Sequence, residues 1–229
     1  FQSSGIEPEL VAPTTWISWG TWTADVTLFK TVLPGSDVPL ILVANDFFFE
    51  RDAIYQGADD VDDFLLRYTF FSRAVVLCCQ SFDIARDVLD CHDWHTALLA
   101  VYLDSGLRGE SHFGPTRSVY TIHNLNYQGA ADAGEFDVTG LHSRYWSGFG
   151  VEHYGQENPM KGGIIFADQV TTVSPTYAAE VQTSEHGAGL DGVLRAVCAK
   201  FTGILNGIDV AEWDPLTDPA RISRWFLPV

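Results

Sequence analysis

The chain has 229 residues, of which 46% are hydrophobic and 19% are charged. This composition is typical of a globular domain with a sizeable core and excludes an intrinsically disordered protein. The formal net charge of −17 argues against nucleic acid and anionic lipid as partners, because a strongly acidic surface repels both. The most apolar stretch, residues 38–49, is interrupted by Asn45 and Asp46 and is too short to cross a bilayer.

The first half of the chain predicts strands followed by a long helix. Residues 1–24 contain prolines and three tryptophans, and we expect them to be irregular. Residues 25–33 and 38–44 are rich in β-branched and apolar side chains and predict two strands. An acidic and aromatic loop over 46–63 precedes a helix over 64–82, in which apolar residues recur at helical spacing.

The second half alternates short strands with helices. This order predicts an α/β fold of the Rossmann-like kind, with a parallel sheet, right-handed crossovers and helices on both faces. Ser174 is expected to cap a helix whose first residue is Pro175. The predicted strands cover 86–91, 117–122, 168–173 and 201–205, the helices cover 92–103, 159–167 and 174–183, and a long loop covers 130–158.

Polar residues follow the predicted strands at the points where ligands bind in open α/β sheets, beyond the carboxyl ends. A sugar needs several such groups, because each hydroxyl both donates and accepts hydrogen bonds. We interpret Ser174 as a helix cap and the other polar residues as candidates for ligand binding. These candidates are Asp93 after the first strand, His123 and Asn124 after the second, and Asn206 after the fourth.

Four other patterns carry less weight. Residues 187–192 fit GxGxxG, but no strand precedes them, so a dinucleotide site is not predicted. No metal site is predicted either: His92 and His95 lack a third ligand at a defined spacing, and His92 is interpreted as structural. The acidic run at 59–63 is interpreted as an exposed loop ahead of a helix, with calcium binding as the minor alternative. The four cysteines form no CxxC pair and are interpreted as reduced thiols of a cytosolic protein.

Several segments together resemble successive blocks of the glycogen and starch synthases that use ADP-glucose. They are FFFERDAIYQG, VLDCHDWHTALLAVYL, SVYTIHNLNYQG, MKGGIIFADQVTTVSPTYAAEV with EHGAGLDGVL behind it, and GILNGIDVAEWDPLTD. The resemblance runs from about Asp37 to Asp218. It implies a GT-B architecture, of which residues 1–229 form one N-terminal catalytic domain, with residues 25–218 family-like. The active site would then lie in the cleft between two Rossmann-like halves.

The resemblance also implies an activity and a set of site residues. The activity is transfer of glucose from ADP-glucose to the non-reducing end of an α-1,4-glucan, with retention and without a metal or cofactor at the reaction centre. It implies a cytoplasmic location, or the plastid stroma in a plant. By the same resemblance, Asp93 and His123 take catalytic positions, and Tyr55, His95, Asn124 and Asn206 take substrate-binding positions.

The chain departs from the family pattern at both ends. Nothing before Asp25 matches the family's Lys-x-Gly-Gly-Leu loop, and the C-terminal nucleotide-binding domain is absent after Val229. We therefore expect the isolated chain to lack synthase activity, and a missing C-terminal domain is a possible partner. Two alternatives stay open: a non-catalytic domain that binds glucan, and a GT-B glycosyltransferase that uses UDP-glucose.

Overall fold

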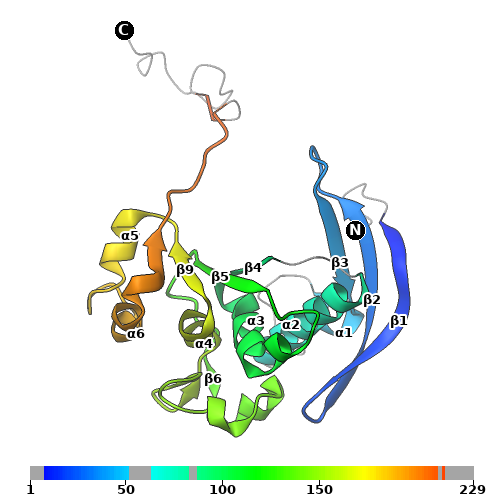
Figure 1. Ribbon diagram of the computed structural model, residues 1–229, viewed down its shortest axis with the longest axis horizontal. Helices are drawn as coiled ribbons and strands as arrows, with labels where there is room; N and C mark the ends of the chain where they lie inside the picture. Colours follow the sequence, from blue (N-terminus) through cyan, green and yellow to red (C-terminus); the bar gives the residue numbers. More distant parts are fainter. Residues whose placement is uncertain (1–7, 52–62, 83–86, 211–212, 215–229) are drawn as a thin grey trace.

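The computed structural model describes residues 8–51, 63–82, 87–210 and 213–214 of the chain. Figure 1 shows an antiparallel sheet in blue on one side of the molecule and a parallel sheet, from green to orange, on the other. Helices lie between the two sheets and beside the parallel one. The expected α/β class with a parallel sheet is confirmed, and the antiparallel sheet is an addition to it.

The antiparallel sheet is built from the N-terminal part of the chain, in the order β1-β2-β3. Trp19 pairs with Trp22 across a two-residue connection that begins at Gly20, whose φ of 51° suits a tight hairpin turn. The two strands expected from sequence correspond to β2 and β3. The bounds are Glu9–Trp19 for β1, Trp22–Val32 for β2 and Pro39–Ala44 for β3.

The expectation that residues 1–24 are irregular is wrong for Glu9–Trp19. This stretch is rich in Thr, Trp, Val and Ile, which favour a pleated surface. The prolines were misleading because β1 is an edge strand, where a residue without an N–H can be accommodated. Pro13 lies where the register with β2 shifts, between Ala12 and Thr15.

One face of the antiparallel sheet packs on α2 (Phe64–Ser81), the long helix predicted from sequence. The rings of Phe48 and Phe70 stack with their centroids 4.4 Å apart. Phe48 comes from α1 (Asp46–Phe49), a single turn that Asn45 caps by accepting from the Phe48 amide. The core of this half consists of Ile17, Trp19, Val26, Leu28, Phe48, Phe70, Ala74 and Cys78.

The acidic residue that precedes α2 is buried, whereas we expected it to lie in an exposed loop. Asp63 is 8% exposed and binds two guanidinium groups. Its carboxylate oxygens accept from Arg67 at 2.8 Å and from Arg51 at 3.0 Å. A buried carboxylate is stable when such partners compensate its lost hydration. The other acidic residues of that run lie outside the described residues.

The parallel sheet has the strand order β10-β9-β5-β4. Each neighbouring pair is parallel, so all four strands end at the same edge. The predicted strands agree with these to within a few residues at each end. The bounds are Val88–His92 for β4, Arg117–Ile122 for β5, Gln169–Thr172 for β9 and Phe201–Gly203 for β10.

The helices of the second half bury alternate side chains of this sheet. Tyr120 and Ile122 of β5 are buried among apolar residues of the helices, whereas Val119 and Thr121 face away and are half-buried. In α4 a Cβ on Gly163 would lie 2.8 Å from the Tyr120 ring, so glycine permits this close approach. The helices are α3 (Asp93–Ser105), α4 (Pro159–Phe166), α5 (Pro175–Glu180) and α6 (Asp191–Ala196). Ser174 caps α5 as predicted, by accepting from the Tyr177 amide.

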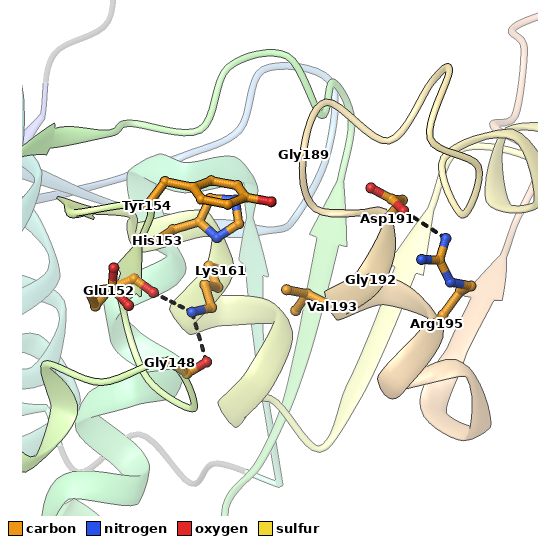
Figure 2. Close-up of a pocket in the computed structure, with 10 residues that line it drawn as sticks. All are labelled: Gly148, Glu152, His153, Tyr154, Lys161, Gly189, Asp191, Gly192, Val193 and Arg195. Atoms are coloured by element: carbon orange, nitrogen blue, oxygen red, sulfur yellow. Dashed lines mark hydrogen bonds and ion pairs between the residues drawn. The ribbon is translucent and has the colours of Figure 1, made fainter.

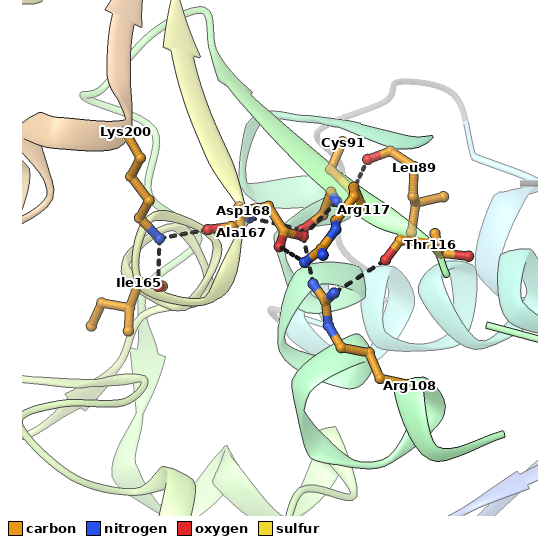
Figure 3. Close-up of polar contacts among 10 residues, drawn as sticks. Leu89, Cys91, Arg108, Thr116, Arg117, Ile165, Ala167, Asp168 and Lys200 are labelled. Carbon is orange, nitrogen blue, oxygen red and sulfur yellow. Dashed lines mark hydrogen bonds and ion pairs between the residues drawn. The ribbon is translucent and has the colours of Figure 1, made fainter. Parts of the chain in front are cut away.

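A charged cluster closes the opposite edge of the sheet, at the amino ends of the strands (Figure 3). Asp168 accepts from Arg108 at 2.5 Å, from Arg117 at 3.1 Å and from the Ser118 amide at 2.8 Å. Burial alone would raise the pKa of Asp168, but these hydrogen bonds hold it well below its usual range. Lys200 donates to the carbonyls of Ile165 and Ala167 at the end of α4. The charged side chains at this edge therefore have a structural role.

The loop predicted over 130–158 contains regular structure that sequence analysis missed. Three two-residue strands form a small sheet in the order β6-β8-β7. A 3-10 helix in this segment contacts the antiparallel sheet, where Trp19 Nε1 donates to the Val138 carbonyl at 2.8 Å. The short elements are η1 (Leu107–Gly109), β6 (Ala131–Asp132), η2 (Ala133–Thr139), η3 (Ser143–Tyr145), β7 (Glu152–His153), β8 (Gln156–Glu157) and η4 (Cys198–Lys200).

The cysteines are free thiols, as expected from their spacing. Cys78, Cys79 and Cys91 are buried, and Cys198 is exposed. Burial raises the pKa of Cys78 and of Cys91 to about 12, so both remain protonated at neutral pH. Within the described part of the chain, no helix is both long and apolar enough to span a membrane.

Candidate active site

The candidate site lies at the carboxyl edge of the parallel sheet, where β4 and β5 end side by side. Asp93 follows β4 and is the first residue of α3, and its φ is 52°. A left-handed backbone is uncommon outside glycine, although aspartate is among the side chains that tolerate it. This turn places the carboxylate over the end of the neighbouring strand rather than along the helix.

The Asp93 carboxylate joins the two strand ends. Its Oδ1 accepts from the His123 amide at 2.8 Å and from the Asn124 amide at 3.4 Å. One carboxylate oxygen therefore orients the loop that follows β5. The structure thus brings together Asp93, His123 and Asn124, three of the residues predicted from sequence.

The His123 side chain pairs with a residue that sequence analysis had classed as structural. His92 Nδ1 and His123 Nε2 share a hydrogen bond of 2.9 Å, and the two rings stack with centroids 5.2 Å apart. On its other side, His92 Nε2 lies 3.4 Å from an Asp90 carboxylate oxygen. His92 therefore orients the His123 imidazole. The signal available in the sequence was its position directly after the predicted strand 86–91, next to Asp93.

His95 lies one helical turn further along α3 and is held by aromatic neighbours. Its ring stacks on Trp94 at a centroid distance of 4.3 Å and meets the edge of Tyr68 at 4.5 Å. Burial lowers the pKa of His95, and the nearby Asp93 carboxylate partly opposes this effect. The ring is therefore neutral at pH 7 and can both donate and accept a hydrogen bond.

The loop after β5 is fixed on both sides. Asn124 Oδ1 accepts from the Asn126 amide at 3.0 Å, which forms a local turn and leaves the Asn124 side chain exposed. Gly129 has a φ of 68°, and a Cβ there would lie 2.2 Å from the Trp94 ring. The backbone therefore lies directly on that indole, and only glycine fits.

Gln128 was not singled out from sequence, yet it links this loop to two others. Its Nε2 donates to the Ala188 carbonyl at 2.9 Å, and its Oε1 accepts from Asn158 at 2.7 Å. Asn158 is also the N-cap of α4, where its Oδ1 accepts from the Lys161 amide. No motif in the sequence indicated this role, because the three segments are far apart along the chain.

One predicted site residue is not joined to this group, and another lies outside the described residues. Asn206 lies three residues beyond the end of β10 and is exposed. Parallel pairing puts that strand end at the same edge, but among the described residues Asn206 makes no hydrogen bond to Asp93 or His123. Tyr55 lies outside the residues that the structure describes. The substrate-binding roles of both remain predictions.

The described residues offer polar positioning groups rather than a metal site. Within the described ranges, no three His, Cys, Asp or Glu side chains are placed to share a metal ion. What the edge does provide is a neutral imidazole, an exposed imidazole, an exposed amide and a carboxylate. Such a set can bind several hydroxyl groups of one sugar.

Comparison with known proteins identifies the family of this chain. Residues 5–196 match the family model described as starch synthase catalytic domain, so the antiparallel hairpin lies within the matched range. The glycogen synthase of Thermotoga maritima is 44% identical over 191 residues, which is 83% of this chain and 38% of that protein. The glycogen synthase of Pseudothermotoga lettingae is 42% identical over 191 residues, with the same coverage of 83% and 38%.

A solved structure agrees with this assignment. It is described as the catalytic domain of starch synthase IV from Arabidopsis thaliana bound to ADP and acarbose. It matches with a TM-score of 0.80 and 32% identity, over 93% of this chain and 43% of that one. The chain thus spans about two fifths of the length of these relatives. The chain belongs to the family of starch synthase catalytic domains.

Proposed function

We propose that this chain contributes the sugar-binding half of a glucosyltransferase that extends an α-1,4-glucan from ADP-glucose with retention. The observation that carries the proposal is the union of Asp93, His123 and Asn124 at the carboxyl edge of the parallel sheet. This edge is where open α/β sheets bind ligands. Family membership supplies the reaction class.

The chemistry assigned to these residues is positioning. In glucosyl transfer the anomeric carbon develops positive charge as the nucleotide leaves, and fixed polar groups lower the barrier by holding the sugar in reactive geometry. His123 and Asn124 are exposed and can bind glucose hydroxyls directly. Asp93 fixes the loop that carries them through one oxygen, and its second oxygen is the candidate for contact with the sugar.

The proposed donor, ADP-glucose, is chosen from what is described for a relative of this chain. The Arabidopsis relative is described as bound to ADP, the nucleotide that ADP-glucose leaves behind after transfer. It is also described as bound to acarbose, which supports a saccharide ligand in this fold. We propose ADP-glucose as donor and an α-1,4-glucan as acceptor, with UDP-glucose as the alternative donor.

The test is transfer of radiolabelled glucose to glycogen by the protein encoded by the whole reading frame that contains these residues. We expect faster incorporation from ADP-glucose than from UDP-glucose, and no incorporation by residues 1–229 alone. His123→Ala should lower kcat/KM about 100-fold, because one positioned hydrogen-bonding group contributes about 3 kcal/mol in such sites. His142→Ala, at a histidine that only caps η3, is the matched control.

Other results would revise the proposal in defined ways. Glycogen binding without incorporation from either donor would replace the transferase with the non-catalytic glucan-binding domain. A preference for UDP-glucose would keep the reaction and change the donor. Full activity in the His123→Ala enzyme would remove the site assignment.

A further inference from the structure

A polar recess lies outside the candidate active site, and Figure 2 draws the residues that line it. Its volume is about 560 Å³, which is in the range of sites that hold small ligands. The chain after η3 and the first turns of α4 form one wall, and the loop before α6 with α6 itself forms the other. None of its side chains belongs to the Asp93 and His123 group.

The first wall presents an aromatic ring to solvent. Tyr154 is 84% exposed, and its backbone is left-handed with a φ of 52°. Its ring lies against the His153 ring, with centroids 4.4 Å apart, and Figure 2 shows the two side chains together at the mouth of the recess. Tyr154 and Gly155, with φ of 52° and 82°, form the two-residue turn between the paired His153 and Gln156, and this turn holds the ring out toward solvent. A sugar ring can stack on such a face.

The opposite wall supplies fixed polar groups. Asp191 and Arg195 form an ion pair of 2.7 Å across one turn of α6, and Arg195 also donates to the Gln182 carbonyl at 2.6 Å. Gly189 and Gly192 expose their backbone on the same wall, as Figure 2 shows. The carboxylate and the guanidinium are therefore held in place before a ligand arrives.

The charges of the recess balance, and this determines the class of ligand. Glu152 and Asp191 oppose Lys161 and Arg195. The Lys161 ammonium is already bound to the Gly148 and Glu152 carbonyls. A phosphate would meet no uncommitted cation here, whereas a neutral polyhydroxyl ligand can use donors and acceptors together.

The His153 imidazole suits the same kind of ligand. Burial is the main cause that lowers its pKa, and the nearby Lys161 ammonium adds to the effect. Hydrogen bonding with the Gly189 backbone and the Glu152 carboxylate oppose this shift. The ring is therefore neutral at pH 7.

The recess is connected to the candidate active site through Gln128. Its side chain binds the Ala188 carbonyl, in the loop that forms the second wall, while its backbone belongs to the loop of His123 and Asn124. Asn158 donates to the Oε1 atom of the same Gln128 side chain, and it also caps α4, the helix that carries Lys161. Gln128 therefore ties the loop of His123 and Asn124 to the loop that forms the second wall of the recess.

We infer that this recess binds a segment of linear α-1,4-glucan, with Tyr154 as the stacking platform and the Asp191–Arg195 pair as the hydroxyl-binding wall. The identity of the sugar rests on the proposed function, whereas the existence of a neutral saccharide site rests on the recess itself. The structure thus assigns the glucan a second set of contacts beyond those at His123.

The test is calorimetric titration of the purified 229-residue chain with maltopentaose. We expect saturable binding, and Tyr154→Asn should raise Kd about tenfold, equivalent to about 1.4 kcal/mol. Asparagine tolerates the left-handed backbone, so this variant removes the ring without adding strain. Tyr154→Phe keeps the ring and should raise Kd less than about threefold. Circular dichroism melting checks that each variant is folded.

Two controls locate the site. Trp16→Thr removes an aromatic side chain that is 68% exposed on the antiparallel sheet, and it should leave Kd unchanged. His142→Ala, at an exposed histidine that caps η3 outside the recess, should also leave Kd within about threefold. Full transfer activity in the His123→Ala enzyme is the separate result that contradicts the proposed transferase site, so the two failures are distinguishable.

Several outcomes would overturn the inference. They are absence of maltopentaose binding by the unaltered chain, an unchanged Kd in Tyr154→Asn, and an equal loss in Trp16→Thr. Equal affinity for cellopentaose, a β-1,4-glucan of the same length, would overturn the assignment to α-glucan.

Discussion

The two sheets of this molecule differ in where they deliver polar side chains. In the antiparallel sheet, neighbouring strands run in opposite directions, so residues that follow β1, β2 and β3 are divided between two edges. In the parallel sheet, the residues that follow β4 and β5 meet at one edge, where Asp93 binds the His123 amide. Strand direction, more than composition, therefore decides which half gathers polar side chains at one edge.

The halves also differ in what holds them together. The antiparallel sheet relies on an aromatic core around Phe70, and it touches the other half through α2 and the Trp19 hydrogen bond to Val138. The parallel sheet has a larger core and a charged cluster around Asp168 at its far edge. We expect substitutions in the antiparallel half to lower stability alone. Substitutions in the parallel half should lower both stability and activity.

The variant with the largest expected effect tests whether the site belongs to the parallel half alone. Asp93→Ala removes the acceptor for the His123 and Asn124 amides and places alanine at a φ of 52°. We expect kcat/KM for glucose transfer to fall about 1,000-fold, or about 4 kcal/mol. The steady-state assay uses the protein of the whole reading frame.

The matched control is Asp25→Ala in the antiparallel sheet, where the carboxylate accepts only a long hydrogen bond of 3.3 Å from Asn45. We expect its kcat/KM to stay within about threefold of the unaltered enzyme. An equal loss in both variants would show that both sheets contribute to the site.

The variant with the next largest expected effect tests whether the two halves unfold together. Phe70 is fully buried and stacks on Phe48, so Phe70→Ala should lower the free energy of unfolding by about 4 kcal/mol. Because α2 packs against both cores, we expect one cooperative urea transition, shifted equally by tryptophan fluorescence and far-ultraviolet circular dichroism. Trp16→Thr, at an exposed position of the same sheet, should leave the midpoint unchanged. Two separate transitions would mean that the halves are independent.

The smallest effect concerns a buried carboxyl group in β8, within the small sheet of residues 130–158. Glu157 is fully buried, and neither of its carboxyl oxygens has a hydrogen-bond partner within the described chain. Burial, with a smaller contribution from Glu135, raises the pKa of Glu157 well above its ordinary value of 4.5. The folded state thus retains a proton that the unfolded state releases. The stability this provides is complete below pH 4.5 and is lost as pH rises toward the folded-state pKa.

Glu157→Gln removes this pH dependence. We expect the variant to match the unaltered chain near pH 4.5 and to exceed its free energy of unfolding by about 2 kcal/mol at pH 7. Urea titrations across this pH range provide the measurement, with Glu185→Gln as a control at an exposed carboxylate. Parallel curves for the two variants would indicate that Glu157 is ionised in the folded protein.

The sequence predicted the parallel half far better than the antiparallel half. Strands such as Arg117–Ile122 are short apolar runs followed by polar residues, and their order determines the topology. The strand Glu9–Trp19 was missed because its prolines suggested irregular structure, although an edge position tolerates them. The helix Asp191–Ala196 was missed because its six residues follow a glycine-rich stretch and carry too little periodicity.

Sequence analysis could predict only those site residues that directly follow a strand. Asp93, His123 and Asn124 follow strands directly, and the structure joins them. His92 and Gln128 act through partners 31 and 60 residues away, and no local pattern reveals such pairs. Asn206 could be placed at the sheet edge by topology, but its distance from Asp93 and His123 depends on loop geometry that sequence does not determine.

The left-handed backbone at Asp93 limits which amino acids can occupy that position. Glycine, asparagine and aspartate adopt this conformation most readily, and of these only the last two have an oxygen that can accept from a neighbouring amide. A saturation library at this codon should therefore retain Asn above all other replacements, ahead of Glu, which preserves the charge but not the backbone fit. Ranking the variants of such a library by activity would distinguish the requirement for a left-handed backbone from the requirement for a carboxylate at this position.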